Sequence, residues 1–148
     1  MLFLVSALAI GAVFWGRFGA DTGIEIVNFD AGPTADFVAR GDGTLSVFPD
    51  VDVYIVALED GRLRAIDGRV EFSGCAVEYL PDDPRGQRLN PFRVPGVLED
   101  PCSGAVWSVA GDAIALVDEP LRTPQLTYGR EEDGVQHVFI EIITVGDD

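Results

Sequence analysis

The chain has 148 residues, of which 47% are hydrophobic and 24% are charged, a composition typical of one globular domain rather than of a disordered segment. Its 25 acidic and 10 basic residues leave a net charge of −15, which excludes the cationic surface that nucleic-acid binding requires. Every basic residue is Arg, so chemistry that depends on Lys is excluded. The single His, His137, excludes any site that needs two His from one chain.

The N-terminal segment predicts a membrane anchor. Residues 2–16 carry no charged side chain, and a helix continued to residue 20 is about 30 Å long, the thickness of a membrane's hydrocarbon core. Trp15, Arg17 and Phe18 suit the membrane interface. We therefore expect one uncleaved transmembrane helix over residues 1–20 and a β domain over residues 21–148. Two alternatives stay open, a cleaved signal peptide and a buried core helix, although no basic residue precedes the apolar run as a signal peptide requires.

The rest of the chain predicts an all-β domain. Short runs rich in β-branched and aromatic residues recur between turn signals such as Asp67-Gly68 and Asp133-Gly134. No stretch after Ala20 keeps a helical period. We expect an antiparallel sandwich or barrel. The predicted strands cover residues 24–29, 45–48, 51–58, 63–66, 105–109, 113–117 and 135–145.

The series of predicted strands is interrupted over residues 79–100, a segment with four prolines. Because proline removes a backbone donor, this segment predicts an irregular loop. A long loop without secondary structure in a compact domain is usually functional or covered by a partner. We expect it to be a partner contact surface, with apolar anchors and arginine partners. The candidate contact residues are Arg85, Arg88, Phe92, Arg93, Val94, Val97 and Leu98.

The two cysteines, Cys75 and Cys102, favour a disulfide, because the N-terminal segment suggests export to an oxidising compartment. Two unrelated buried thiols are the alternative. A disulfide places the domain on the extracytoplasmic side of the membrane, periplasmic or extracellular, although Arg17 on the domain side weakly opposes this orientation.

The sequence around each cysteine resembles a cluster-binding box of the Rieske iron–sulfur proteins. The two stretches read V-E-F-S-G-C over residues 70–75 and D-P-C-S-G-A-V-W over residues 100–107, against C-T-H-L-G-C and C-P-C-H-G-S in that family. Each family box supplies one Cys and one His to a [2Fe–2S] cluster, and the remaining two Cys form a disulfide that braces the loops. The matching positions are Gly74, Cys75, Pro101, Cys102, Gly104 and the aromatic Trp107.

The four ligand positions depart from the family pattern, since they hold Val70, Phe72, Asp100 and Ser103. The resemblance therefore implies an antiparallel Rieske-like sandwich whose region 70–107 has lost its cluster but kept the bracing disulfide. We expect no cofactor and no metal. Val70 and Phe72 are expected to fill part of the vacated space with apolar volume.

Other motifs have simpler interpretations. The tripeptide Arg40-Gly41-Asp42 is expected to be a turn, and the Asp pairs at 50/52 and 82/83 to be solvated loops rather than Ca²⁺ ligands. His137 is expected to be a surface or hydrogen-bonded core residue, and no serine lies in a nucleophile elbow. We expect no enzymatic activity.

These features lead to a functional hypothesis. The chain is expected to be a non-redox accessory or structural subunit of a respiratory or photosynthetic electron-transfer complex, with the other subunits as its partners. A c-type cytochrome is a further candidate partner, because the acidic surface can attract a basic protein; alternatively, the acidity is a genomic trait. The alternative function is a free-standing anchored module that binds a soluble cytochrome or a small ligand.

Overall fold

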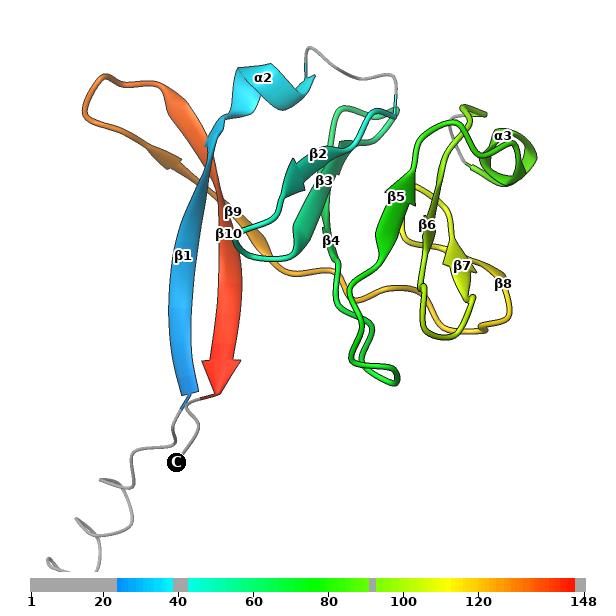
Figure 1. Ribbon diagram of the computed structural model, residues 1–148. Coiled ribbons are helices and arrows are strands. Elements are labelled where there is room, and N and C mark those ends of the chain that lie inside the picture. Colours follow the sequence, from blue (N-terminus) through cyan, green and yellow to red (C-terminus); the bar gives the residue numbers. More distant parts are fainter. Residues whose placement is uncertain (1–23, 39–42, 91–92, 146–148) are drawn as a thin grey trace, which may run out of the picture. The chain divides into compact units, whose positions relative to one another are not determined.

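The computed structural model describes residues 24–38, 43–90 and 93–145 (Figure 1). The predicted anchor at residues 1–20, the tripeptide at 40–42 and Phe92 lie outside these residues. No helix in the described part of the chain is long and apolar enough to cross a membrane. The chain divides into two compact units, one formed by residues 1–27 with 143–148 and the other by residues 28–142. The sites described below lie in the larger unit, whereas strands β1 and β10 extend from it into the smaller one.

The fold is all-β, as predicted, and every strand pair with a defined register is antiparallel. Three sheets have the strand orders β1-β10-β9, β2-β3-β4 and β5-β6-β7-β8. The first contains β1 (Ile24–Pro33), β10 (Gln136–Val145) and β9 (Leu126–Arg130). The second contains β2 (Ser46–Phe48), β3 (Val53–Ala57) and β4 (Leu63–Asp67). The third contains β5 (Glu78–Leu80), β6 (Val97–Glu99), β7 (Val106–Trp107) and β8 (Ala113–Ala115). The helices α2 (Thr34–Val38) and α3 (Arg85–Leu89) are short.

Strand β3 contributes to two hydrophobic cores, which explains why its sequence VYIVA is apolar throughout. Successive side chains of a strand point to opposite faces. Ile55 packs with Val138 and Ile140 in one cluster, whereas Val56 packs with Trp107 in the other. Strand β3 is therefore buried on both faces.

The β9–β10 hairpin follows from its turn sequence. The Glu131 N–H donates to the Val135 carbonyl at 3.0 Å, and Gly134 adopts a φ of 79°, which only glycine takes without strain. This turn closes the predicted strand over residues 135–145, which is confirmed as β10.

The proline-rich segment over residues 79–100 is more regular than predicted. It contains helix α3 and most of strands β5 and β6. Asn90 orders the turn after the helix, because its buried side-chain amide donates to the carbonyls of Val94 (2.9 Å) and Gly96 (2.7 Å). Its side-chain oxygen accepts the Val109 N–H at 2.9 Å. The segment is therefore irregular only between these short elements, and the Asn90 side chain orders the stretch that follows α3.

The regular structure of this segment also contradicts the prediction for two of the contact residues, Val97 and Leu98. Val97 and Leu98 have no exposed surface, because β6 lies between β5 and β7 in the sheet. They are core residues and not surface anchors. Val94 is half-buried against the same core, whereas Arg88 and Arg93 are exposed.

Candidate functional site

The candidate site is a pair of loops that carry the two cysteines. In the first loop, residues 70–75, the Val70 N–H donates to the Cys75 carbonyl at 2.9 Å. The Gly74 N–H donates back to the Val70 carbonyl at 2.7 Å. Gly74 has a φ of 70°, and the Ser73 hydroxyl oxygen accepts the Cys75 N–H. These bonds fold six residues into one tight turn.

The second loop, residues 100–105, has the same backbone arrangement. The Asp100 N–H donates to the Ala105 carbonyl at 2.9 Å, and the Gly104 N–H donates to the Asp100 carbonyl at 2.8 Å. Gly104 has a φ of 75°, and the Ser103 hydroxyl oxygen accepts the Ala105 N–H. The two Ser-Gly pairs therefore perform the same local role in both loops. The repeated Ser-Gly spacing was visible in the sequence, but its structural meaning was not inferred from it.

A disulfide joins the two loops, as predicted. Cys75 at the end of the first loop is bonded to Cys102 in the second, and their Cα atoms lie 6.4 Å apart. The loops are thereby fixed to one another in addition to their own internal bonds.

The carboxylate of Asp100 is the buried polar centre of the second loop. It has no exposed surface, and it accepts the Ser103 hydroxyl at 2.6 Å and the Cys102 N–H at 2.9 Å. Burial acts to raise the pKa of this carboxyl, but these hydrogen bonds, with a contribution from the Ser73 hydroxyl of the first loop, outweigh burial and lower the pKa. Asp100 is therefore a structural anion.

The four positions that correspond to cluster ligands have different environments. Val70 is buried in the core around Trp107, so it fills space as expected. Phe72 is 62% exposed, so the expectation that it fills a vacated space was wrong. The tight turn holds Phe72 near the apex of the loop, and Val70 at its base already contributes to the core. Ser103 is exposed, although its hydroxyl donates a hydrogen bond to the Asp100 carboxylate.

These residues do not fit a [2Fe–2S] cluster. Cys75, Asp100 and Cys102 have potential ligand atoms within 4.8 Å of one another, but both sulfurs belong to the disulfide. The Asp100 carboxylate is already hydrogen-bonded on both oxygens. The oxidised loops therefore offer neither thiolate nor imidazole, the ligands that such a cluster requires.

The end of the loop pair presents apolar side chains, which we call the tip surface: Phe72, Pro101 and Leu116. Leu116 is 81% exposed, and its side chain lies beside Gly104 of the second loop. A Cβ atom at position 104 would be 3.6 Å from the Leu116 Cδ1 atom. In Figure 1 both loops and the segment after β8 lie at the same end of the β5–β8 sheet. Leu116 also has a φ of 60°, an uncommon conformation for a branched side chain. Nothing in the local sequence pattern around Leu116 signals this exposure.

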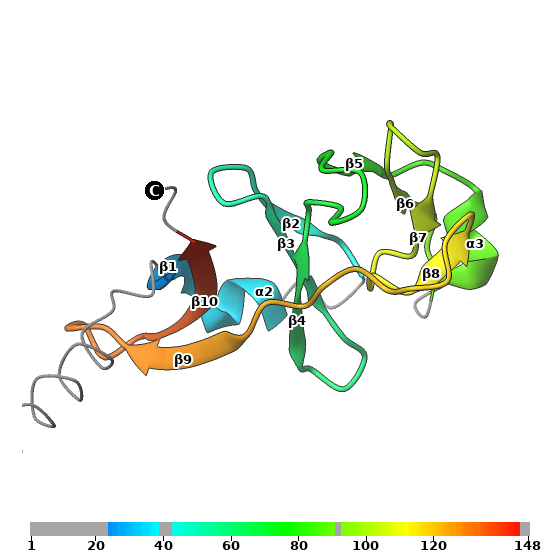
Figure 2. The ribbon, with the colours of Figure 1, turned by 90° about the horizontal axis from the view of Figure 1, so that it is seen from below.

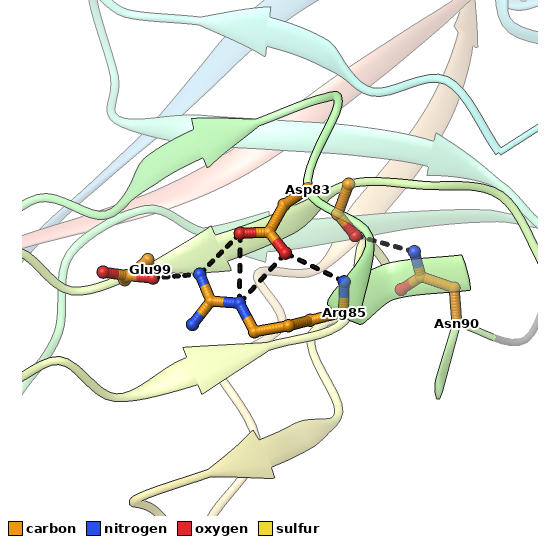
Figure 3. Close-up of polar contacts among 5 residues, drawn as sticks. Asp83, Arg85, Asn90 and Glu99 are labelled. Atoms are coloured by element: carbon orange, nitrogen blue, oxygen red, sulfur yellow. Dashed lines mark hydrogen bonds and ion pairs between the residues drawn. The ribbon is translucent and has the colours of Figure 1, made fainter. Parts of the chain in front are cut away.

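A separate ion-pair cluster holds the beginning of α3 (Figure 3). The Arg85 guanidinium donates to both carboxylate oxygens of Asp83, with a shortest distance of 2.6 Å, and also to Glu99. Arg85 lowers the pKa of the Asp83 carboxyl through these side-chain bonds and its backbone N–H. The predicted contact residue Arg85 is therefore paired within its own chain, although its side chain remains 43% exposed.

His137 forms a pair with Asp30 on the neighbouring strand. The His137 Nδ1 atom lies 2.9 Å from the Asp30 carboxylate, and Glu131 is close enough to complete a group of three potential metal ligands. The bond to Asp30 raises the pKa of His137. Burial acts to raise the pKa of Asp30, but the bonds to His137 and to the Gly32 N–H outweigh it and lower the pKa. The hydrogen bond accounts for this arrangement without a metal.

No family model matches the chain, and no curated protein or solved structure matches it either. The functional argument therefore depends on the geometry of the loops and of the surfaces around them.

Proposed function

We propose that the chain is a cluster-free, Rieske-like domain that serves as a non-redox structural subunit of a membrane electron-transfer complex. One observation carries the proposal: two loops of equal length and equal backbone hydrogen bonding are joined by a disulfide at the positions where the resembling family braces its cluster loops. The loop framework is present, and the ligands are replaced by Val70, Phe72, Asp100 and Ser103.

The replacements favour a structural role over electron transfer. Val70 adds to the core, and the Asp100 carboxylate bonds the Ser103 hydroxyl. Both interactions stabilise the loops without a metal. A rigid surface loses little conformational entropy on binding, so a loop pair held by a disulfide suits docking.

The tip surface is the proposed contact with the partner subunit. Phe72 and Leu116 are 62% and 81% exposed, and large exposed apolar side chains gathered on one surface mark interaction sites. The proposed occupant is an apolar face of another subunit on the extracytoplasmic side, where a disulfide is stable. Arg88 lies on α3, at the other end of the β5–β8 sheet from the two loops, so it is not assigned to the tip surface (Figure 1).

The alternative function is a free-standing module that binds a soluble cytochrome. The net charge of −15 favours it, since an acidic protein attracts a basic partner at low ionic strength. Under this alternative the chain has no permanent subunit partner in the membrane.

Native electrophoresis of membranes solubilised in mild detergent tests the proposal, with mass spectrometry of the band that contains the chain. We expect the wild-type chain to migrate with redox subunits and the Phe72→Asp variant to migrate alone. Val47→Asp is the matched control, because Val47 is 50% exposed on β2 and lies outside the tip surface. A wild-type chain that migrates alone would overturn the subunit proposal. Salt-sensitive retention of that chain on an immobilised basic cytochrome would then support the alternative.

A further inference from the structure

A groove of about 500 Å³ lies between strands β4 and β9, and none of the tip-surface residues lines it. Leu63 and Ala65 of β4 line one wall, and Leu126 and Tyr128 of β9 line the other. Figure 2 shows the two strands diverging from the point where the chain crosses β4 on its way to β9. No segment among the described residues fills the groove.

Both walls are sheet edges. β4 ends the β2-β3-β4 sheet, and β9 ends the β1-β10-β9 sheet. An edge strand carries backbone donors and acceptors that no neighbouring strand pairs, and such edges are sites where an extended segment can add.

The register shows which backbone groups of β4 face the groove. The Leu58 N–H donates to the Arg62 carbonyl, and the Gly68 N–H donates to the Asp52 carbonyl, so even-numbered residues of this segment pair with β3. Backbone groups alternate in direction along an antiparallel strand, so those of Leu63 and Ala65 point away from β3. The Asp67 N–H follows the same alternation and donates outward to the Arg122 carbonyl at 2.8 Å.

The same reasoning applies to β9. The Glu131 N–H donates to the Val135 carbonyl, and the Glu141 N–H donates to the Gln125 carbonyl, so odd-numbered residues pair with β10. The backbone groups of Leu126 and Tyr128 therefore point away from β10. All four residues with outward backbone groups line the groove.

The groove carries two arginines on an acidic protein, and each already lies near a carboxylate of this chain. Arg62 is paired with Asp60, and the Arg64 Nη1 atom lies 3.7 Å from the Asp112 carboxylate. Arg62 and Arg64 are two of only ten cationic side chains, and the Arg62 side chain is 77% exposed. The Arg64 Nη1 atom donates to the Ala110 carbonyl at 2.9 Å, which fixes the guanidinium beside the groove. A carboxylate on a bound segment is the chemical complement of these groups.

We propose that this groove binds an extended acidic segment of a partner protein, which adds as a strand along the edge of β4 and places carboxylates at Arg62 and Arg64. The backbone edges supply affinity, and the arginines select acidic over basic side chains. The inference does not depend on the function proposed for the tip surface.

Fluorescence anisotropy of the full-length chain in detergent tests the proposal with a labelled synthetic peptide of alternating Val and Glu. We expect saturable binding, and binding about tenfold weaker when every Glu is replaced by Lys. N-methylation of every second peptide nitrogen removes backbone donors. Two such peptides are compared, one methylated at odd-numbered and one at even-numbered positions. At least one of them should bind about tenfold more weakly, because strand addition uses the backbone donors of alternate residues.

The paired variant Arg62→Glu/Arg64→Glu should weaken binding by about tenfold, whereas Arg88→Glu/Arg93→Glu makes the same charge change elsewhere and should leave it unchanged. Hydrogen exchange on the wild-type chain supplies a readout that needs no variant, since the peptide should protect the amides of Leu63 and Ala65 on the edge of β4. Absence of saturable binding would overturn the proposal. The proposal would also be overturned if both N-methylated peptides bound as tightly as the unmodified one, or if glutarate displaced the peptide completely. Either result would show that the site binds a simple anion and not an added strand.

Discussion

Asp100 and Ser103 are bonded to each other: the buried carboxylate accepts the serine hydroxyl at 2.6 Å. In the family that the sequence resembles, these two positions would supply a Cys and a His to a metal cluster. Here they form a polar contact inside one loop. The loop is therefore stabilised by groups of its own, and the structural role proposed above relies on this hydrogen bonding.

Removing the Asp100 carboxylate should destabilise the domain. Asp100→Ala leaves the Cys102 N–H and the Ser103 hydroxyl without their buried acceptor, which should cost about 2–4 kcal/mol. Asp100→Asn keeps one acceptor oxygen and should cost less. Urea unfolding measures both values, and a cost for Asp100→Ala near zero would contradict the structural role of this group.

Asp100 also predicts a dependence of stability on pH. Its pKa is lower in the folded protein, so its contribution is present above pH 3.8, the ordinary value, and is lost as the pH falls through the lowered value. The stability of the Asp100→Asn variant should therefore decline less at acidic pH than that of the wild type. Urea titrations between pH 2 and 5 compare the two curves, and parallel curves would be the contrary result.

The disulfide should stabilise the folded state chiefly by restricting the unfolded chain. Cys75 and Cys102 are 27 residues apart, and the chain-entropy model gives a contribution of about 3–4 kcal/mol for a loop of this size. Cys75→Ser/Cys102→Ser should lose that amount in urea unfolding. Ser6→Ala, in the predicted anchor and remote in sequence from both loops, serves as the control. A loss below about 1 kcal/mol would mean that the hydrogen bonds alone order the loop pair.

The Asp30–His137 pair predicts a window of pH in which it stabilises the fold. The pKa of His137 is raised, so its contribution is complete below pH 6.5 and is lost as the pH rises through the folded value. The pKa of Asp30 is lowered, so its contribution is present above pH 3.8 and is lost at lower pH. The difference in melting temperature between wild type and His137→Gln should be largest between these two values. A difference that persists unchanged at pH 9 would contradict the pairing.

Val70 and Phe72 should respond differently to truncation although both replace ligands of the resembling family. Val70→Ala opens space in a buried cluster and should cost about 1–3 kcal/mol, whereas Phe72→Ser should change stability by less than about 0.5 kcal/mol because the ring is mostly exposed. Thermal or urea unfolding separates the two. A large cost for Phe72→Ser would show that the ring packs against the domain.

Local signals predicted much of this fold. The alternation over residues 135–145 and the preceding Asp133-Gly134 turn predicted strand β10, and the cysteine pair predicted the disulfide, whereas β9 was not predicted. These features depend on neighbours in sequence or on a residue type with one dominant chemistry.

Other features depend on neighbours distant in sequence and could not be predicted from local pattern. Val97 and Leu98 were expected on a surface, but their strand lies inside a sheet whose order the sequence does not state. The groove joins β4 and β9 across more than fifty residues and was likewise not foreseen. Its arginines carried no motif, because their role depends on which strands form the sheet edges.

Site-specific photocrosslinking in native membranes tests the central claim most directly. A benzoylphenylalanine at position 72, which retains an aromatic side chain on the tip surface, should crosslink to one redox subunit of the complex. The same probe at position 47, where Val47 is 50% exposed, should not form that product. Absence of a product at position 72, or the same products at both positions, would contradict the claim that the disulfide-linked loops dock the chain onto an electron-transfer complex.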